Sequence, residues 1–125
     1  MCTIPKSLGH LSNLAYLCLQ RNQLSDSIPP EIGNLFNLVE FDISNNNLTG
    51  LIPSTIGNIE KLIMLHMYKN HLSGSVPQEI GNLKSLIYLS LHTNNLSGLI
   101  PTSLGALSKP NYFTHVQQST FGHHS

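Results

Sequence analysis

The chain has 125 residues, with six basic and six acidic side chains, no tryptophan and two cysteines. This balanced charge gives no electrostatic reason to bind nucleic acid or an anionic membrane. The cysteines, Cys2 and Cys18, are too few for a disulfide framework and lack metal-ligand spacing. Composition therefore argues against the strongly charged and the disulfide-stapled classes, and the length fits one domain.

A proline and an asparagine each recur at one constant interval along the chain. The recurring positions are Pro5, Pro29, Pro53, Pro77 and Pro101, and Asn22, Asn46, Asn70 and Asn94. A fixed period of this size predicts a solenoid of stacked units. The units that begin at Leu14, Leu38, Leu62 and Leu86 follow the pattern L-x-x-L-x-L-x-x-N-x-L. This is the leucine-rich repeat pattern, in which each unit adds one short strand to a parallel sheet.

The alternation within each strand predicts which side chains form the core. Leu17 and Leu19 are expected to point inward, whereas Tyr16, Cys18 and Gln20 point outward. Further inward rows are predicted by the same period: Ile28, Ile52, Val76 and Ile100; Ile32, Ile56, Ile80 and Leu104; Leu35, Ile59, Leu83 and Leu107. One coil cannot bury such rows, so the units are expected to be stable only as a stack.

The asparagine column is expected to be structural. After each strand the chain turns, and the amides of Asn22, Asn46, Asn70 and Asn94 can satisfy backbone groups left inside. Gly50, Gly74 and Gly98 supply a further turn, where Asp26 stands in the first full unit. The Gly-Asn pairs at 33–34, 57–58 and 81–82 are assigned to convex-side turns, and a short 3₁₀ helix fits between proline and glycine.

The string Leu-Ser-Gly-x-Ile-Pro-x-x-Ile-Gly-Asn-Leu resembles the plant-specific class of leucine-rich repeat over residues 4–109. The resemblance, above all to receptor-like kinase ectodomains, implies an α/β right-handed solenoid. Its parallel sheet would form the concave face, with an extra short strand near Ser-Gly-x-Ile-Pro and 3₁₀ helices and loops on the convex face. It further implies a non-catalytic scaffold without cofactors that recognises a peptide or protein ligand or a co-receptor. Such a parent protein lies at the plasma membrane, on its extracellular side.

Two features of the sequence depart from that family. We find no signal peptide, capping cysteines, membrane-spanning run or kinase, so the solenoid is expected to be uncapped and the location of this chain stays open. The repeats are assigned to residues 1–109 and a non-repeat tail, expected to be disordered, to 110–125. Codon degeneracy permits a one-base shift after Lys109 that restores a repeat unit. A slipped reading frame is therefore our hypothesis for the tail, to be checked against the transcript.

The outward strand positions form the candidate binding face. Their mixture of aromatic, polar and charged groups suits a peptide-like partner, although an ordinary solvated sheet face would look similar. The candidate residues are Tyr16, Gln20, Arg21, Glu40, Asp42, Met64, His66, Tyr68, Lys69, Tyr88 and His92.

Two chemical interpretations of this face are not favoured. Asp42, His66 and Ser90 fall in one row in the order of a hydrolytic triad, but an open sheet offers no oxyanion hole. Cys18, Asp42, His66 and His92 would not converge on a metal. We therefore predict no enzyme activity and no metal. Two alternatives to a receptor fragment remain: a secreted inhibitor of a cell-wall-degrading enzyme, and a non-functional truncated product.

The tripeptides Asn47-Leu48-Thr49 and Asn95-Leu96-Ser97 match the N-glycosylation pattern. Each acceptor asparagine follows a ladder asparagine and is expected to point outward. The match could also be a by-product of the N-x-L-S/T repeat itself. Asn47 and Asn95 therefore matter as acceptors only if the segment belongs to a secreted parent.

Overall fold

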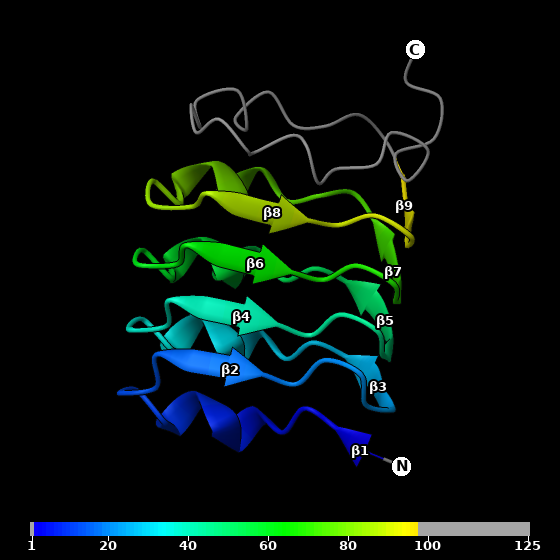
Figure 1. The fold of residues 1–125 in the computed structure, drawn as a ribbon, viewed down its shortest axis with the longest axis horizontal. Coiled ribbons are helices and arrows are strands. Elements are labelled where there is room, and N and C mark those ends of the chain that lie inside the picture. The colour runs from blue at the N-terminus through cyan, green and yellow to red at the C-terminus, as the bar shows by residue number, and fades with distance from the viewer. Residues whose placement is uncertain (1, 98–125) are drawn as a thin grey trace.

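The computed structural model describes residues 2–97, which form a stack of similar coils (Figure 1). Each coil runs through a strand on one face, a second short strand at the adjacent side, and a 3₁₀ helix behind the first strand. Within the described residues, the strands form one four-stranded and one five-stranded parallel sheet. The predicted α/β leucine-rich-repeat solenoid is confirmed, including the extra short strand. Predictions for residues 98–125, including the tail and the last member of each row, lie outside the described part.

The four-stranded sheet repeats with the period of the sequence. Its strands are β2 (Tyr16–Cys18), β4 (Glu40–Asp42), β6 (Met64–His66) and β8 (Tyr88–Ser90), paired in that order. Every partner is the equivalent residue of the next unit, so that Tyr16 stands beside Glu40 and Glu40 beside Met64. Equivalent repeat positions are therefore immediate neighbours on this sheet, which corresponds to the predicted concave face.

The five-stranded sheet has a different register. Its strands are β1 (Cys2–Thr3), β3 (Leu24–Ser27), β5 (Asn47–Leu51), β7 (His71–Gly74) and β9 (Asn95–Leu96). Here each partner falls two positions short of the repeat equivalent, so that Thr49 stands beside His71 and not beside Ser73. Because this sheet slips in every coil while the other sheet stays in step, successive coils are sheared past each other on this side of the solenoid.

Four 3₁₀ helices within residues 2–97 form the opposite side of the coils: η1 (Lys6–His10), η2 (Pro30–Asn34), η3 (Ser54–Asn58) and η4 (Gln78–Asn82). The Gly-Asn pairs lie on this side, as predicted, but they are the last two residues of η2, η3 and η4, so these helices extend beyond the predicted span between proline and glycine. Their glycines are required by packing. A Cβ added at Gly57 would lie 2.6 Å from the carbonyl oxygen of Glu79 in the next helix. A residue without a side chain lets neighbouring coils approach closely.

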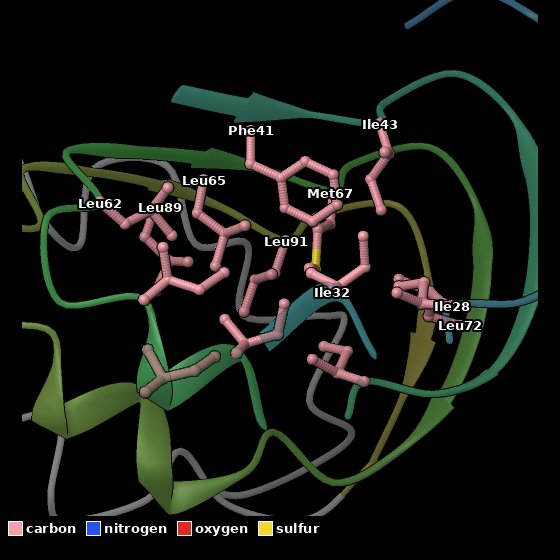
Figure 2. Close-up of a cluster of buried hydrophobic side chains, with 14 of the residues drawn as sticks. Ile28, Ile32, Phe41, Ile43, Leu62, Leu65, Met67, Leu72, Leu89 and Leu91 are labelled. Atoms are coloured by element: carbon pink, nitrogen blue, oxygen red, sulfur yellow. The ribbon is translucent and has the colours of Figure 1, made fainter. Parts of the chain in front are cut away.

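The core occupies the space between the strands and the helices (Figure 2). Phe41 points from β4 into this cluster near Met67, and both are fully buried. The predicted rows of Ile28, Ile32 and Leu35 are buried wherever they fall in the described residues, whereas Leu19 in the first full unit is only partly buried against the core. The apolar rows therefore run continuously from coil to coil, as expected for units that cannot bury their cores alone.

The asparagines join the two sheets. Asn70 Nδ2 donates to the carbonyl oxygens of Ile43 and Met67, which follow strands of the four-stranded sheet, at 3.0 and 3.1 Å. Asn70 Oδ1 accepts from the backbone N–H of Leu48 in β5, at 3.1 Å. Asn46 makes the equivalent bonds one coil earlier. One amide side chain thus satisfies donors and acceptors from both sheets.

The first and last ladder asparagines differ in exposure. Asn94 repeats the pattern with bonds to Met67 and Leu91 carbonyl oxygens and from the Leu72 N–H. Asn22 is exposed, and its Nδ2 donates to carbonyl oxygens of its own coil, those of Leu19 and Gln20. Asn22 therefore does not share the buried position predicted for the whole column.

Left-handed backbone recurs at two positions of each coil. Asp26, Gly50 and Gly74 have φ values of 69°, 80° and 74°, so Asp26 does replace a glycine that the turn uses. Arg21 and Lys69 have φ values of 59° and 57° in the turn after the strand.

No helix among residues 2–97 has the length and apolarity needed to cross a bilayer.

Candidate functional site

The outer surface of the four-stranded sheet brings most of the predicted binding residues together. Register places Tyr16, Glu40, Met64 and Tyr88 in one row, and Cys18, Asp42, His66 and Ser90 in the next. Strands lie about 4.8 Å apart, so side chains of one row are close enough to contact a single ligand. The sheet therefore gathers residues from four coils that are far apart in sequence.

A chain of side-chain contacts crosses three coils of this face. His66 Nδ1 lies 3.7 Å from Asp42 Oδ2. The centroids of the His66 and Tyr68 rings are 5.6 Å apart, and the two ring planes are inclined at 59° to each other. Tyr68 in turn stacks on His92, with centroids 4.8 Å apart and planes 11° from parallel. His92 Nδ1 is 2.9 Å from the Thr93 hydroxyl. These contacts fix the rings in a defined arrangement across the sheet.

Asp42 differs from its predicted role. It was placed among the outward, ligand-facing residues, but it is only 8% exposed. Its Oδ1 accepts from the Ser44 N–H at 3.0 Å and from the Ser44 hydroxyl at 2.7 Å. One carboxylate oxygen is thus hydrogen-bonded to Ser44, and the other lies near His66. Because Asp42 is buried, we expect it to position His66 and not to contact a ligand itself.

Ser44 and Thr93 belong to the same face by repeat position but were not included among the candidate binding residues. Ser44 is fully buried and holds the Asp42 carboxylate, and Thr93 contacts the His92 ring. The spacing of Asp42, at the end of β4, and Ser44, two residues later, was the available signal for the first contact. The second depends on the conformation of the turn, which the pattern does not encode.

The remaining predicted residues surround this chain of contacts. Tyr16 and Tyr88 are exposed at the start of their strands, with 61% and 40% of their surfaces accessible. Glu40 and Met64 are half-buried between them. Three further residues are exposed at or just beyond the opposite strand ends: Gln20, Arg21 and Lys69. The face therefore has an aromatic margin at the strand starts and basic groups after the strand ends.

The geometry does not favour hydrolytic chemistry at the acid–histidine–serine row. Ser90 is 3% exposed, so its hydroxyl is not presented to a substrate. The distance of 3.7 Å between His66 and Asp42 also exceeds that of an orienting hydrogen bond. Among residues 2–97, no group of three or more His, Cys, Asp or Glu side chains is arranged to hold a metal ion. The face combines aromatic, polar and charged side chains, several of which are held by contacts with one another, and such a surface suits recognition of a partner.

Stacked coils, a parallel sheet of equivalent positions and an asparagine ladder together define a leucine-rich repeat protein. The family model described as a leucine-rich repeat region matches residues 3–113. The chain belongs to this family. A comparison with curated protein sequences gives no significant match.

Solved structures with a similar fold are ectodomains of plant receptor kinases. The Arabidopsis thaliana membrane receptor kinase GASSHO1/SCHENGEN3, solved with CASPARIAN STRIP INTEGRITY FACTOR 2, is 42% identical with a TM-score of 0.82; the match covers 84% of this chain and 13% of that one. The Arabidopsis receptor kinase HAESA, solved with the peptide hormone IDA and the co-receptor SERK1, is 38% identical with a TM-score of 0.81, covering 84% and 18%.

A shorter relative is matched over more of its length. The Arabidopsis thaliana BIR3–SERK2 complex contains a chain 40% identical to this one, with a TM-score of 0.79 and coverage of 88% and 59%. The present chain therefore spans less than a fifth of the GASSHO1/SCHENGEN3 and HAESA chains and about three fifths of the shorter one.

Proposed function

We propose that this chain is a recognition segment of a receptor-kinase-type ectodomain and binds a peptide or protein through its four-stranded sheet. The observation that carries the proposal is the chain of contacts from Asp42 through His66 and Tyr68 to His92. It holds aromatic and imidazole rings in place before any ligand arrives. A surface whose side chains are already ordered loses less conformational entropy on binding.

The chemistry of the face suggests how such a ligand would lie. The half-buried stack of Tyr68 and His92 offers a flat surface for an apolar or planar side chain, as aromatic anchors do in other interfaces. Lys69 lies immediately beside it in sequence and is exposed, so it is available to an acidic or carbonyl group. Tyr88 and Met64 at the strand starts would contact the other side of an extended peptide.

The similar receptor structures support the same role. One of them was solved with CASPARIAN STRIP INTEGRITY FACTOR 2 and another with the peptide hormone IDA and the co-receptor SERK1, and both contain repeats that superpose on most of this chain. Because this chain spans only part of their length, its partner is a proposal. We place the parent protein at the plasma membrane, with these repeats outside the cell and any catalytic activity in a separate domain.

A peptide selection tests the proposal directly. The full chain is immobilised and used to enrich binders from a library of random peptides displayed on phage. Peptides that bind the proposed surface should lose about tenfold or more in affinity for Tyr68→Ala and His92→Ala, because truncating a hot-spot anchor typically costs about 2 kcal/mol or more and a tenfold loss is about 1.4 kcal/mol. Affinity is measured by biolayer interferometry.

The matched controls lie on the opposite side of the coils. Asn58→Ala and Glu60→Ala change exposed residues at η3 and just after it, and should leave affinity within about twofold. Peptides that respond to the η3 variants and ignore Tyr68→Ala and His92→Ala would place recognition elsewhere. A library that yields no binder would also count against the proposal.

A further inference from the structure

The five-stranded sheet presents a different chemistry from the four-stranded one. Its outer side chains are mostly hydroxyls and amides. They include Ser25, Ser27, Asn47, Thr49, Ser73 and Asn95. Within this set, two strands carry the tripeptide pattern of an N-linked glycan acceptor: Asn47 to Thr49 in β5, and Asn95 to Ser97 beginning in β9.

The strand geometry places the asparagine and the hydroxyl residue of each tripeptide on the outer face. Side chains two residues apart in a strand point the same way, while the one between them points inward. Accordingly Asn47 and Thr49 are exposed while Leu48 is fully buried. The second tripeptide repeats this arrangement, with Leu96 buried at 4% exposure between exposed Asn95 and Ser97.

Adjacent asparagines in the same coil have opposite environments. Asn46 is 6% exposed, and its Nδ2 donates to three carbonyl oxygens, those of Leu19, Ile43 and Ser44. Asn47 is exposed, and no hydrogen bond links its side-chain amide to another described residue. The ladder therefore uses Asn46, whereas Asn47 is left accessible and chemically available.

We propose that Asn47 and Asn95 carry N-linked glycans in the parent protein, an inference that rests on its proposed extracellular role. In the transfer step, the Asn Nδ2 forms a bond to the anomeric carbon of an oligosaccharide carried on a lipid diphosphate. The bond between that sugar and the phosphate breaks, the lipid diphosphate leaves, and the amide nitrogen loses one proton. The transferase of the secretory pathway performs this reaction, and the chain supplies the acceptor amide and the hydroxyl two residues later.

The two sites have a shared consequence for recognition. Both glycans would project from the five-stranded sheet, in alternate coils, because His71 takes the acceptor position in the intervening strand. Because the register slips by two positions in each coil, Asn95 stands across from Leu51 and not from Asn47. With strands about 4.8 Å apart and a rise of about 3.3 Å per residue, the two attachment points are separated by about 16 Å. The glycans would cover this sheet and leave the four-stranded sheet open to a ligand.

Cell-free translation with microsomes tests the acceptor sites. The full chain is fused behind a cleavable secretory signal. Only the product that is protected from added protease, and has therefore entered the lumen, is analysed on a gel with and without endoglycosidase. Each attached glycan gives one step in mobility that endoglycosidase removes, and the unaltered chain should show two such glycan steps. Asn47→Gln and Asn95→Gln should each show one step, and the double variant none.

Conservative variants separate acceptor chemistry from general effects. Thr49→Ala should remove one step, whereas Thr49→Ser, which keeps the hydroxyl, should retain both. Asn82→Gln changes an exposed asparagine of η4 outside the pattern and should also retain both. A protected but unmodified chain would overturn the proposal. If the unaltered chain carries only one glycan, the proposal fails for one site. That site is the one whose Gln variant still carries the single glycan.

The glycan readout is independent of ligand binding. Loss of glycans in this assay would leave the proposed recognition surface untouched, and failure of the peptide selection would leave the gel result untouched. Glycosylated chain should bind a selected peptide within about twofold of the enzymatically deglycosylated chain. A glycan-dependent loss of tenfold or more would contradict the assignment of recognition to the uncovered sheet.

Discussion

The two sheets of this solenoid are built from the same repeat, yet they differ in register, chemistry and proposed use. In the four-stranded sheet each residue stands beside its own repeat equivalent in the next coil. In the five-stranded sheet the partner falls two positions short of that equivalent, so different repeat positions meet. The first sheet carries ring contacts and charged groups, and the second carries hydroxyls and amides.

This difference shows how a uniform repeat produces two unlike surfaces. In a sheet whose register matches the repeat, the same repeat position of every coil lies in one row. When the residue at that position varies, different side chains become neighbours, as Asp42, His66 and Ser90 do. A sheet out of step instead places different repeat positions side by side, such as Thr49 beside His71. Equivalent positions thus form straight rows on the four-stranded sheet only.

The largest expected effect is loss of the core under the four-stranded sheet. Phe41→Ala should lower the free energy of unfolding by about 3–5 kcal/mol, because it leaves a cavity at a fully buried aromatic position. Thr49→Ala on the outer face of the five-stranded sheet should change it by less than about 0.5 kcal/mol. Urea denaturation measures both values. Similar losses for the two variants would show that stability does not divide between the sheets in this way.

The connection between the sheets should be the next most sensitive feature. Asn70→Ala removes the partner of the Leu48 backbone N–H, and a buried group left unsatisfied costs about 1–3 kcal/mol. Asn22→Ala, at an exposed position with bonds only inside its own coil, should cost clearly less. The same denaturation experiment compares them. Equal losses would mean that the links between sheets add nothing to the bonds within one coil.

A smaller effect is expected for the ring contact on the four-stranded sheet. A double-mutant cycle with Tyr68→Ala, His92→Ala and the double variant should give a coupling free energy of about 0.5–1.5 kcal/mol, typical of stacked rings. The cycle with Tyr88→Ala in place of His92→Ala provides a comparison on the same face. A coupling near zero for Tyr68 and His92 would remove the argument that the rings are ordered before binding.

The smallest expected effect concerns the left-handed position of the five-stranded sheet. Asp26→Gly should raise the free energy of unfolding by less than about 1 kcal/mol, because relief at φ 69° is partly offset by greater freedom of the unfolded chain. Ser27→Gly, at the next residue of β3, should instead lower it by about 0.5–1 kcal/mol. Thermal and urea unfolding together measure these shifts. Destabilisation by Asp26→Gly would indicate that the aspartate side chain itself stabilises the turn.

Much of the fold was predictable because a solenoid repeats its local rules. The fixed period of the sequence predicted the strands, the inward rows such as Ile32 and Ile56, and the neighbours of Tyr16 along the sheet. The prediction for the Gly-Asn pairs considered only the turn and missed that they end the 3₁₀ helices. The closeness of Gly57 to the carbonyl of Glu79 is a contact between coils that no single unit contains.

By itself, the sequence determined the length of each coil, the apolar rows and the set of outward side chains, because each follows from spacing along one chain. Only the tertiary structure decided which outward residues remain accessible and which contact each other. The stacking of Tyr68 on His92 depends on side-chain directions in neighbouring coils, and the burial of Asp42 at 8% exposure could not be read from the outward position that alternation assigns to it. The slip of the second sheet likewise arises when coils pack, since the geometry of stacking, and not the repeat length, sets the offset between them.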